Sequence, residues 1–157
     1  MSNVIAFTKV RLPYGWLGNM APYPIEYEGD VYPTSEALFQ ALRFGDVASR
    51  AMIRAQTSPM AAKMVAKGNA ARMTIKQFSY TDVDNMQLVL RLKTEQHPQL
   101  VLLLLATGDA TIVEDVTARR DNSALFWGAA NVNGKWFGSN TLGKLWMARR
   151  AQLGGNS

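Results

Sequence analysis

The stretch Thr81–Gly108, with the sequence TDVDNMQLVLRLKTEQHPQLVLLLLATG, decides the fold class of this chain. Thr81-x-x-Asp84 is a capping-box-like start and predicts a long helix. Pro98 should end that helix, because the residue before a proline avoids helical backbone. Pro98 can itself open a second, short apolar helix that ends at Gly108. The middle of the chain is therefore expected to be helical.

Helix and strand signals continue on both sides of this stretch. Helices are expected from Pro33-Thr34-Ser35 to about Gly45 and from Ser58-Pro59 to Gly68, and a last one should be capped by Ser139 or Asn140 and reach about Leu153. Strands are expected at residues 3–10, 24–27, 31–32, 111–116 and 125–130, with turns at Glu28-Gly29-Asp30 and Asn133-Gly134. Segregated short strands and runs of helices predict an α+β fold. We expect a single compact, mostly helical domain over residues 1–153 with a small antiparallel sheet, followed by a flexible tail at 154–157.

Composition excludes several classes of protein and site. The chain has 157 residues, which favours one domain, and it has no cysteine, which excludes disulfides and a cysteine nucleophile. A single histidine, His97, argues against a catalytic triad or a multi-histidine metal site, and we expect neither metal nor cofactor. The longest apolar run, Leu100–Ala106, is far below the roughly 20 residues that span a bilayer. With no signal-peptide pattern at the N-terminus, we expect a cytoplasmic protein that binds no membrane.

The chain carries a net charge of +5, which favours anionic partners such as phosphates, nucleotides or nucleic acid. An ordinary soluble surface explains this charge equally well. Phosphate-loop signatures of the GxGxxG or GxxxxGK[ST] type do not occur in the sequence.

Two helices carry polar residues in positions that could serve chemistry. Glu36, Gln40 and Arg43 fall on one helical face, where they either line a pocket or form a solvated surface. Lys93 falls between Met86 and Leu90 on an apolar arc. It is either desolvated, with a lowered pKa and a reactive neutral amine, or it extends past the helix end into water.

Other charged residues have simpler explanations. Glu114 shares a strand face with apolar neighbours, and Arg149 shares an apolar helical stripe, so a buried Glu114–Arg149 or Glu36–Arg149 ion pair is expected. The cluster Arg119-Arg120-Asp121 is interpreted as an exposed loop, and His97 as a solvated helix end.

Read in order, several motifs resemble the NADAR family. They are Trp16-Leu17-Gly18-Asn19, Tyr32-Pro33-Thr34-Ser35-Glu36-x-x-Phe39-Gln40-Ala41, Ser58-Pro59, Lys93-x-x-Gln96-His97-Pro98, Val113-Glu114, Trp127-Gly128 and Gly138-x-Asn140-x-Leu142-Gly143. The resemblance covers roughly residues 14–153. It implies a small α+β, mostly helical N-glycosidase that hydrolyses the N–C1′ bond of a ribosylated base, either a riboflavin-pathway intermediate or ADP-ribosylated guanine. The alternative is a non-catalytic module that binds ADP-ribose or a nucleotide, and ADP-ribosylated nucleic acid is a further expected partner.

The resemblance also assigns residues. A lysine that forms a Schiff base with the opened ribose is expected in this family, and Lys93 matches it best by position and by its apolar setting. The implied catalytic residues are Glu36, Lys93 and Asp121. The implied substrate-binding residues are Asn19, Gln40, Arg43, Glu114, Trp127, Asn140 and Arg149. Trp127 would stack on the base, Arg43 or Arg149 would hold phosphate, and Asn140 would cap the last helix and line the pocket.

Three positions depart from the family pattern. Ala37 stands where a histidine is common, and Arg43 stands where a lysine is common; a guanidinium cannot replace a lysine nucleophile because it stays protonated. Ala124 stands where an acidic residue is common, and Asp121 is expected to substitute for it. These departures suggest a divergent branch with a different substrate.

Overall fold

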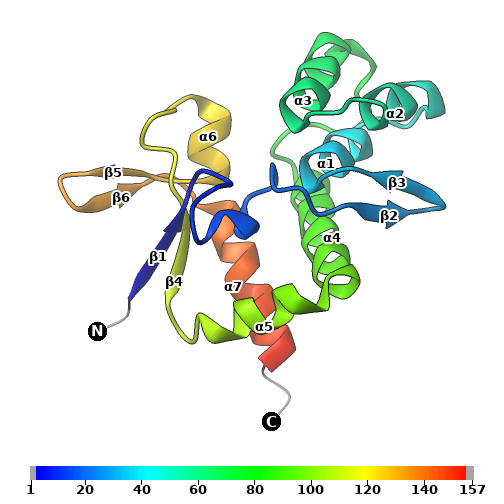
Figure 1. Cartoon of the computed structure of the whole chain (residues 1–157). Coiled ribbons are helices and arrows are strands. Elements are labelled where there is room, and N and C mark those ends of the chain that lie inside the picture. Colours follow the sequence, from blue (N-terminus) through cyan, green and yellow to red (C-terminus); the bar gives the residue numbers. More distant parts are fainter. Residues whose placement is uncertain (1–2, 155–157) are drawn as a thin grey trace. The chain divides into compact units, whose positions relative to one another are not determined.

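The computed structural model describes residues 3–154, and the chain divides into two compact units (Figure 1). One unit is residues 19–97. The other combines the segment that ends at Gly18 with the segment that begins at Pro98. The α+β, mostly helical fold class is confirmed, with small two-stranded sheets beside the helices. The single domain over residues 1–153 stays a prediction. Within residues 3–154, every helix is too short or too polar to cross a bilayer.

The 19–97 unit begins with the predicted hairpin. Strands β2 (Ile25–Tyr27) and β3 (Asp30–Tyr32) pair in antiparallel fashion. Glu28 and Gly29 both have positive φ, 52° and 86°, which is the backbone of a tight two-residue hairpin turn. The turn signal in the sequence is therefore confirmed.

Four α-helices follow in this unit: α1 (Ser35–Leu42), α2 (Val47–Arg54), α3 (Pro59–Gly68) and α4 (Tyr80–Gln96), with the short η2 (Ala70–Arg72) before the last. Ser58 caps α3 by accepting a hydrogen bond from the Ala61 amide at 2.9 Å, as predicted. The sequence analysis did not predict helix α2. It is capped by Asp46, whose carboxylate accepts from the Ser49 amide.

The start of α4 differs from its prediction. Ser79, and not Thr81, is the N-cap, and its hydroxyl accepts from the Asp82 amide. The chain enters this cap through Phe78, whose φ of 67° is left-handed. The Thr81-x-x-Asp84 pattern therefore predicted an N-cap two residues after the observed one. The helix ends before Pro98, as expected.

The other unit is built around a buried tryptophan on its last helix. Trp146 of α7 (Thr141–Gly154) is fully buried, and its indole N–H donates to the Leu17 carbonyl at 2.9 Å. Leu17 ends the short η1 (Gly15–Leu17), and Trp16 meets the Trp146 ring edge-on. The unit also contains α5 (Pro98–Ala106) and the antiparallel hairpin of β5 (Ala130–Val132) and β6 (Lys135–Phe137). Of the predicted tail, Gly154 belongs to α7, and residues 155–157 lie outside the described residues.

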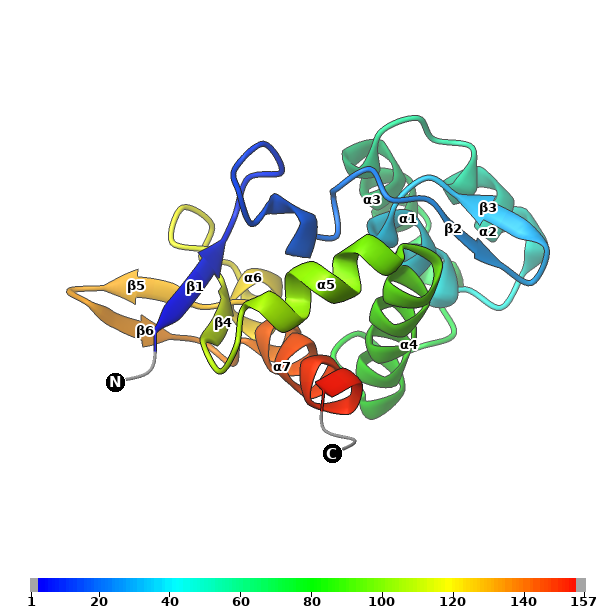
Figure 2. The same cartoon turned by 60° about the horizontal axis from the view of Figure 1, so that its bottom comes forward.

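Two strand predictions in this unit need correction. The segment 125–130 was expected to be a strand, but residues 125–127 belong to α6 (Asn122–Trp127), whose N-cap is Asp121, and only Ala130 lies in a strand. Strand β1 (Val4–Phe7) pairs in parallel with β4 (Thr111–Glu114), whereas only antiparallel pairing was expected. Figure 2 shows β1 and β4 side by side. The Asn133-Gly134 turn is confirmed.

Candidate active site

The ten residues assigned from sequence divide equally between the two units. Asn19, Glu36, Gln40, Arg43 and Lys93 lie in the 19–97 unit. Glu114, Asp121, Trp127, Asn140 and Arg149 lie in the other.

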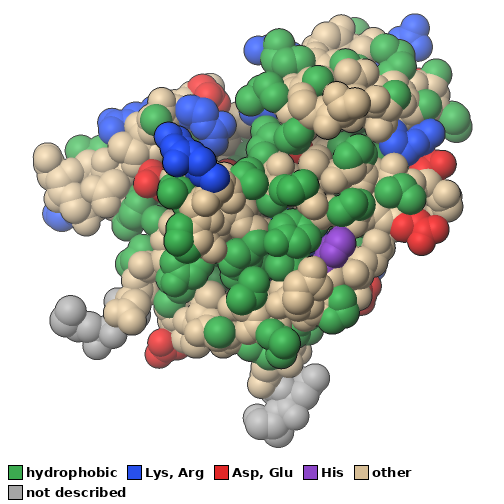
Figure 3. Space-filling model, in the orientation of Figure 1, with side chains coloured by type: hydrophobic (Ala, Val, Ile, Leu, Met, Phe, Trp, Pro, Cys, Tyr) green, Lys and Arg blue, Asp and Glu red, His purple; other side chains and the backbone are tan. Residues whose placement is uncertain are grey.

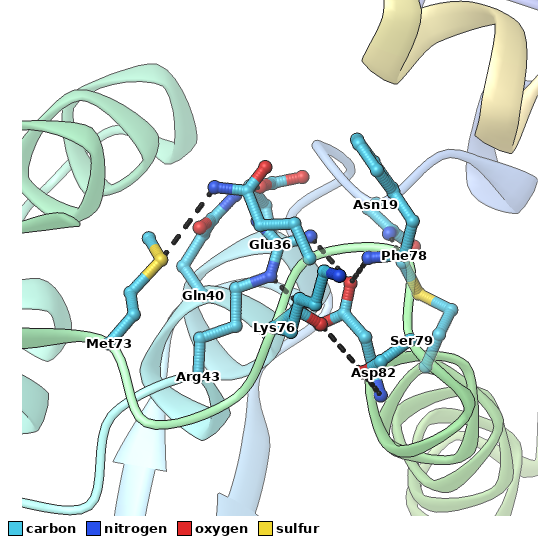
Figure 4. Close-up of polar contacts among 11 residues, drawn as sticks. Asn19, Glu36, Gln40, Arg43, Met73, Lys76, Phe78, Ser79 and Asp82 are labelled. Atoms are coloured by element: carbon cyan, nitrogen blue, oxygen red, sulfur yellow. Dashed lines mark hydrogen bonds and ion pairs between the residues drawn. The ribbon is translucent and has the colours of Figure 1, made fainter.

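The polar face of α1 is buried. All eight residues of α1 are buried, and the Glu36 side chain is only 8% exposed. The Gln40 amide donates to the Glu36 carboxylate at 2.6 Å, one helical turn away (Figure 4). The interpretation of this face as an ordinary solvated surface is therefore wrong. A buried carboxylate needs a hydrogen-bond partner, which Gln40 supplies, and the residue remains a candidate for binding or catalysis.

Arg43, at the end of α1, is held by a partner that sequence analysis missed. Its guanidinium forms a two-pronged ion pair with Asp82 of α4, with N···O distances of 2.9 Å and 2.8 Å (Figure 4). Asp82 is fully buried and also accepts from the Phe78 amide. The guanidinium also lies over the Phe39 ring, 4.6 Å from its centroid. A buried guanidinium needs a carboxylate partner, but the sequence alone does not say which of the carboxylates pairs with Arg43. The phosphate-binding role for Arg43 stays a prediction, but its charge is already neutralised.

Lys93 is completely buried, so its extension into water is excluded. Its ammonium nitrogen lies 5.3 Å from the centroid of the Tyr23 ring. Burial lowers the pKa of Lys93 from 10.5 to about 7, because the charged form loses its hydration. Near neutral pH, a large fraction of the side chain is therefore the neutral amine that can act as a nucleophile.

His97 is more than a solvated helix end. Its ring nitrogen Nε2 lies 2.6 Å from the Pro24 carbonyl oxygen, and its ring meets the Tyr23 ring edge-on at 5.2 Å. The ring is partly exposed and is the purple side chain of Figure 3. Through these contacts His97 positions Tyr23, the aromatic neighbour of Lys93.

One face of α4 brings these residues into a line. Asp82, Met86 and Lys93 are four and seven residues apart, which places them on the same side of the helix. Asp82 binds Arg43, directly after the C-terminal end of α1. Met86 contacts Asn19, and the Asn19 backbone carbonyl accepts from the Glu36 amide at the N-terminal end of α1. The two helices therefore run in opposite directions. Lys93 lies about 10 Å along the axis beyond Met86, at 1.5 Å per residue.

In the other unit, the Asn140 side chain is bound differently from the predicted cap, while its role in lining the substrate pocket stays a prediction. Its side chain does not cap α7. The side-chain oxygen Oδ1 accepts from the backbone amide of Glu114 at 3.0 Å, and the side-chain nitrogen Nδ2 donates to the backbone carbonyl of Ile112 at 2.9 Å. The Asn140 side chain is therefore bound to β4. Asn140 reaches this position with a φ of 49°. A Cβ on Gly143 would collide with the Ile112 carbonyl and the Asn140 side chain, which explains the glycine.

The remaining assigned residues of this unit are placed as follows. Asp121 is exposed, as expected for its charged cluster, and caps α6 by accepting from the Ala124 amide at 2.9 Å. Trp127 is buried at the end of α6 and meets the Phe126 ring edge-on. Glu114 and Arg149 are half-buried, and Arg149 donates to Gln152 at 3.3 Å. The roles of these residues in binding or catalysis, and the expected ion pairs of Arg149, stay predictions.

Comparisons with known proteins give a consistent result. The model of the NADAR domain matches residues 6–154. The chain is 39% identical over 150 residues to N-glycosidase YbiA of Shigella sonnei, covering 96% of this chain and 88% of that protein. It is 30% identical to a riboflavin biosynthesis protein of Vibrio vulnificus, matching 98% of this chain but 39% of that protein. The NMR structure of Escherichia coli YbiA matches with a TM-score of 0.80 and 36% identity, covering 98% of this chain and 86% of that one.

Proposed function

This chain belongs to the NADAR domain family, and from that premise we propose that it is an N-glycosidase that hydrolyses the N–C1′ bond of a ribosylated base. The names of its relatives, an N-glycosidase and a riboflavin biosynthesis protein, favour a small ribosylated intermediate of riboflavin synthesis as substrate. ADP-ribosylated guanine is the second substrate to be tested.

The observation that carries the proposal is the buried amine of Lys93. Burial brings its pKa to about 7, so that the nucleophilic neutral form is populated at the pH of the cell. An exposed lysine, with a pKa above 10, would be almost entirely protonated. The chain therefore maintains a reactive amine in a place where a purely structural residue would be apolar.

The reaction proceeds in two covalent stages. The Lys93 nitrogen attacks C1′, the bond from C1′ to the base breaks, and the base leaves with the proton that the amine loses. Protonation and departure of the ring oxygen then give a Schiff base between Lys93 and C1′. Water adds to C1′, the C1′–Nζ bond breaks, and the products are the free sugar and the regenerated amine. The net change is hydrolysis of one N–C1′ bond.

Glu36 supplies the negative charge that this chemistry requires. C1′ becomes positively charged as the base departs, and a buried carboxylate stabilises such charge more strongly than one in water. The hydrogen bond from Gln40 fixes the orientation of the Glu36 carboxylate. In the hydrolytic stage the same carboxylate takes a proton from the attacking water. Three further roles are proposed from the resemblance. Trp127 would stack on the base, and Arg149 would bind phosphate. Asp121 would contribute its carboxylate to catalysis.

The test is turnover of two substrates, a ribosylaminopyrimidine phosphate and an oligonucleotide with ADP-ribosylated guanine, followed by the release of free sugar. We expect turnover of the first substrate, and a loss of several orders of magnitude in Lys93→Met. Lys67→Met, at an exposed position of α3, is the matched control and should retain activity. Absence of turnover on both substrates with folded protein would overturn the proposal. Micromolar binding of ADP-ribose without product would instead identify a binding module.

A further inference from the structure

Two buried polar atoms near the start of α1 lack hydrogen-bond partners. Among the described residues, neither Oδ1 of Asn19 nor the hydroxyl of Ser35 has a partner. Asn19 is 8% exposed and Ser35 is fully buried. Such atoms are rare in folded proteins, because each gives up its hydrogen bonds to water without replacement. One lies in the first turn of α1, and the other belongs to the residue whose backbone carbonyl accepts from the Glu36 amide, so together they point to a ligand that completes them.

The orientation of the Asn19 amide follows from its neighbour. The nitrogen Nδ2 lies 3.2 Å from the sulfur of Met86. A thioether accepts hydrogen bonds but cannot donate them, so the NH2 end of the amide faces the sulfur and the carbonyl end remains open. The Asn19 backbone is fixed as well, since its carbonyl accepts from the Glu36 amide at 3.0 Å. Asn19 is therefore held beside the first turn of α1 with an acceptor available.

The same turn offers few donors to an anion. The Ala37 amide donates to the Thr34 hydroxyl, the Leu38 amide to the Thr34 carbonyl, and the Glu36 amide to Asn19. The Glu36 carboxylate adds negative charge at this place and repels a phosphate. What remains at the start of α1 is the Asn19 Oδ1 acceptor, the Glu36 carboxylate and the Ser35 hydroxyl, on residues that the Glu36 amide to Asn19 carbonyl hydrogen bond holds together. This group fits a ligand that presents neutral donors.

We propose that Asn19, Ser35 and Glu36 form a subsite for the vicinal hydroxyls of a ribose, so that the protein selects ribose over 2-deoxyribose. The inference rests on the proposed function, because an N-ribosidic substrate brings these hydroxyls. Each ribose hydroxyl donates one hydrogen bond, either to Asn19 Oδ1 or to the Glu36 carboxylate. The Ser35 hydroxyl can donate to or accept from one of the two ribose hydroxyls. A sugar without the 2-hydroxyl leaves one buried acceptor without a partner, which costs binding about tenfold or more.

The experiment measures binding of ribose 5-phosphate and 2-deoxyribose 5-phosphate by calorimetry. The wild type should bind the ribose compound at least about tenfold more tightly. Asn19→Leu keeps the side-chain shape but cannot accept, and Ser35→Ala removes the hydroxyl; each should reduce the preference to about twofold or less. Asn85→Leu on α4 is the matched control and should retain the preference.

Thermal unfolding separates this role from a structural one. Replacing an unpartnered buried oxygen with an apolar group should leave Tm unchanged or raise it in Asn19→Leu and Ser35→Ala, although both lose selectivity. A preference for ribose 5-phosphate that both variants retain would overturn the subsite, and so would equal or undetectable wild-type binding of the two sugars. If the enzyme turns over its ribosylated substrate but binds ribose 5-phosphate and 2-deoxyribose 5-phosphate equally, only the subsite proposal is overturned. Selective binding without turnover supports the subsite and overturns the proposed hydrolysis.

Discussion

Replacement of Lys93 by methionine should change how the stability of the protein depends on pH. Burial lowers the pKa of Lys93 to about 7 in the folded protein, against 10.5 in the unfolded chain. Between these values the unfolded chain binds a proton that the folded protein does not, so the free energy of unfolding rises with pH. At about 1.4 kcal/mol per unit, the whole window corresponds to roughly 5 kcal/mol, of which about 2 kcal/mol falls between pH 7 and 9.

The neighbouring ring does not cancel this effect. The Tyr23 ring favours the charged form of Lys93 by about 1–2 kcal/mol at the distance observed, which is smaller than the cost of burial. Methionine fills a similar volume without a charge, so Lys93→Met should be more stable than the wild type at pH 7 and below. Stabilisation of a protein by removal of an active-site residue is expected when the residue is kept for function.

The assay is urea unfolding of the wild type, Lys93→Met and Lys67→Met at pH 6, 7, 8 and 9. All other titrating groups are shared, so the difference between the first two curves isolates Lys93. We expect that difference to shrink by about 2 kcal/mol from pH 7 to pH 9, and Lys67→Met to follow the wild type. Parallel curves for wild type and Lys93→Met would show that Lys93 keeps an ordinary pKa, and the nucleophile argument would fail.

Three further predictions follow from the same residues. The kcat/KM of the wild type should rise with pH up to about 7 and then level, since Lys93 must be neutral to attack; a profile flat from pH 5 to 8 would refute this. Asp82→Ala should lower the free energy of unfolding by about 3–5 kcal/mol, because it leaves the Arg43 guanidinium buried without its carboxylate; a loss below 1 kcal/mol in urea unfolding would contradict it. Asp121→Asn should keep the α6 cap and thus the Tm, but it should lower turnover, because it removes the proposed catalytic carboxylate; unchanged turnover would leave Asp121 with the cap alone.

Local signals in the sequence predicted the elements whose causes are local. The Glu28-Gly29 turn needs two residues that tolerate positive φ, and the α3 start needs Ser58 followed by Pro59, so both could be inferred from neighbouring residues alone. The burial of Lys93 was also accessible, because helical spacing places it on the same arc as Met86 and Leu90. Its lowered pKa then follows from desolvation.

Features that depend on distant residues could not be predicted. The parallel pairing of β1 with β4 joins residues 4–7 to residues 111–114, far apart in the sequence, and no local pattern encodes that partner. The wrong strand prediction at 125–130 is different, because the Asp121 cap that starts α6 is a local signal that the apolar run outweighed. Arg43 and Asp82 were each visible as charges, but only the packing of α1 against α4 makes them a pair.

The unsatisfied atoms of Asn19 and Ser35 were invisible to sequence analysis for the same reason. Asn19 was assigned to substrate binding only by resemblance, and Ser35 was read as part of a helix cap. Their importance depends on what surrounds them after folding, namely the Met86 sulfur and the occupied amides of the α1 start.

The central claim is that Lys93 bonds covalently to C1′ of the substrate sugar, and borohydride trapping tests it most directly. Wild type, Lys93→Met and Lys67→Met are incubated with ribosylaminopyrimidine phosphate and sodium borohydride, and the intact masses and peptides are measured. We predict an added mass equal to the reduced sugar phosphate in the wild type and Lys67→Met, located on Lys93, and none in Lys93→Met. An adduct on another lysine, or full turnover by Lys93→Met, would contradict the account.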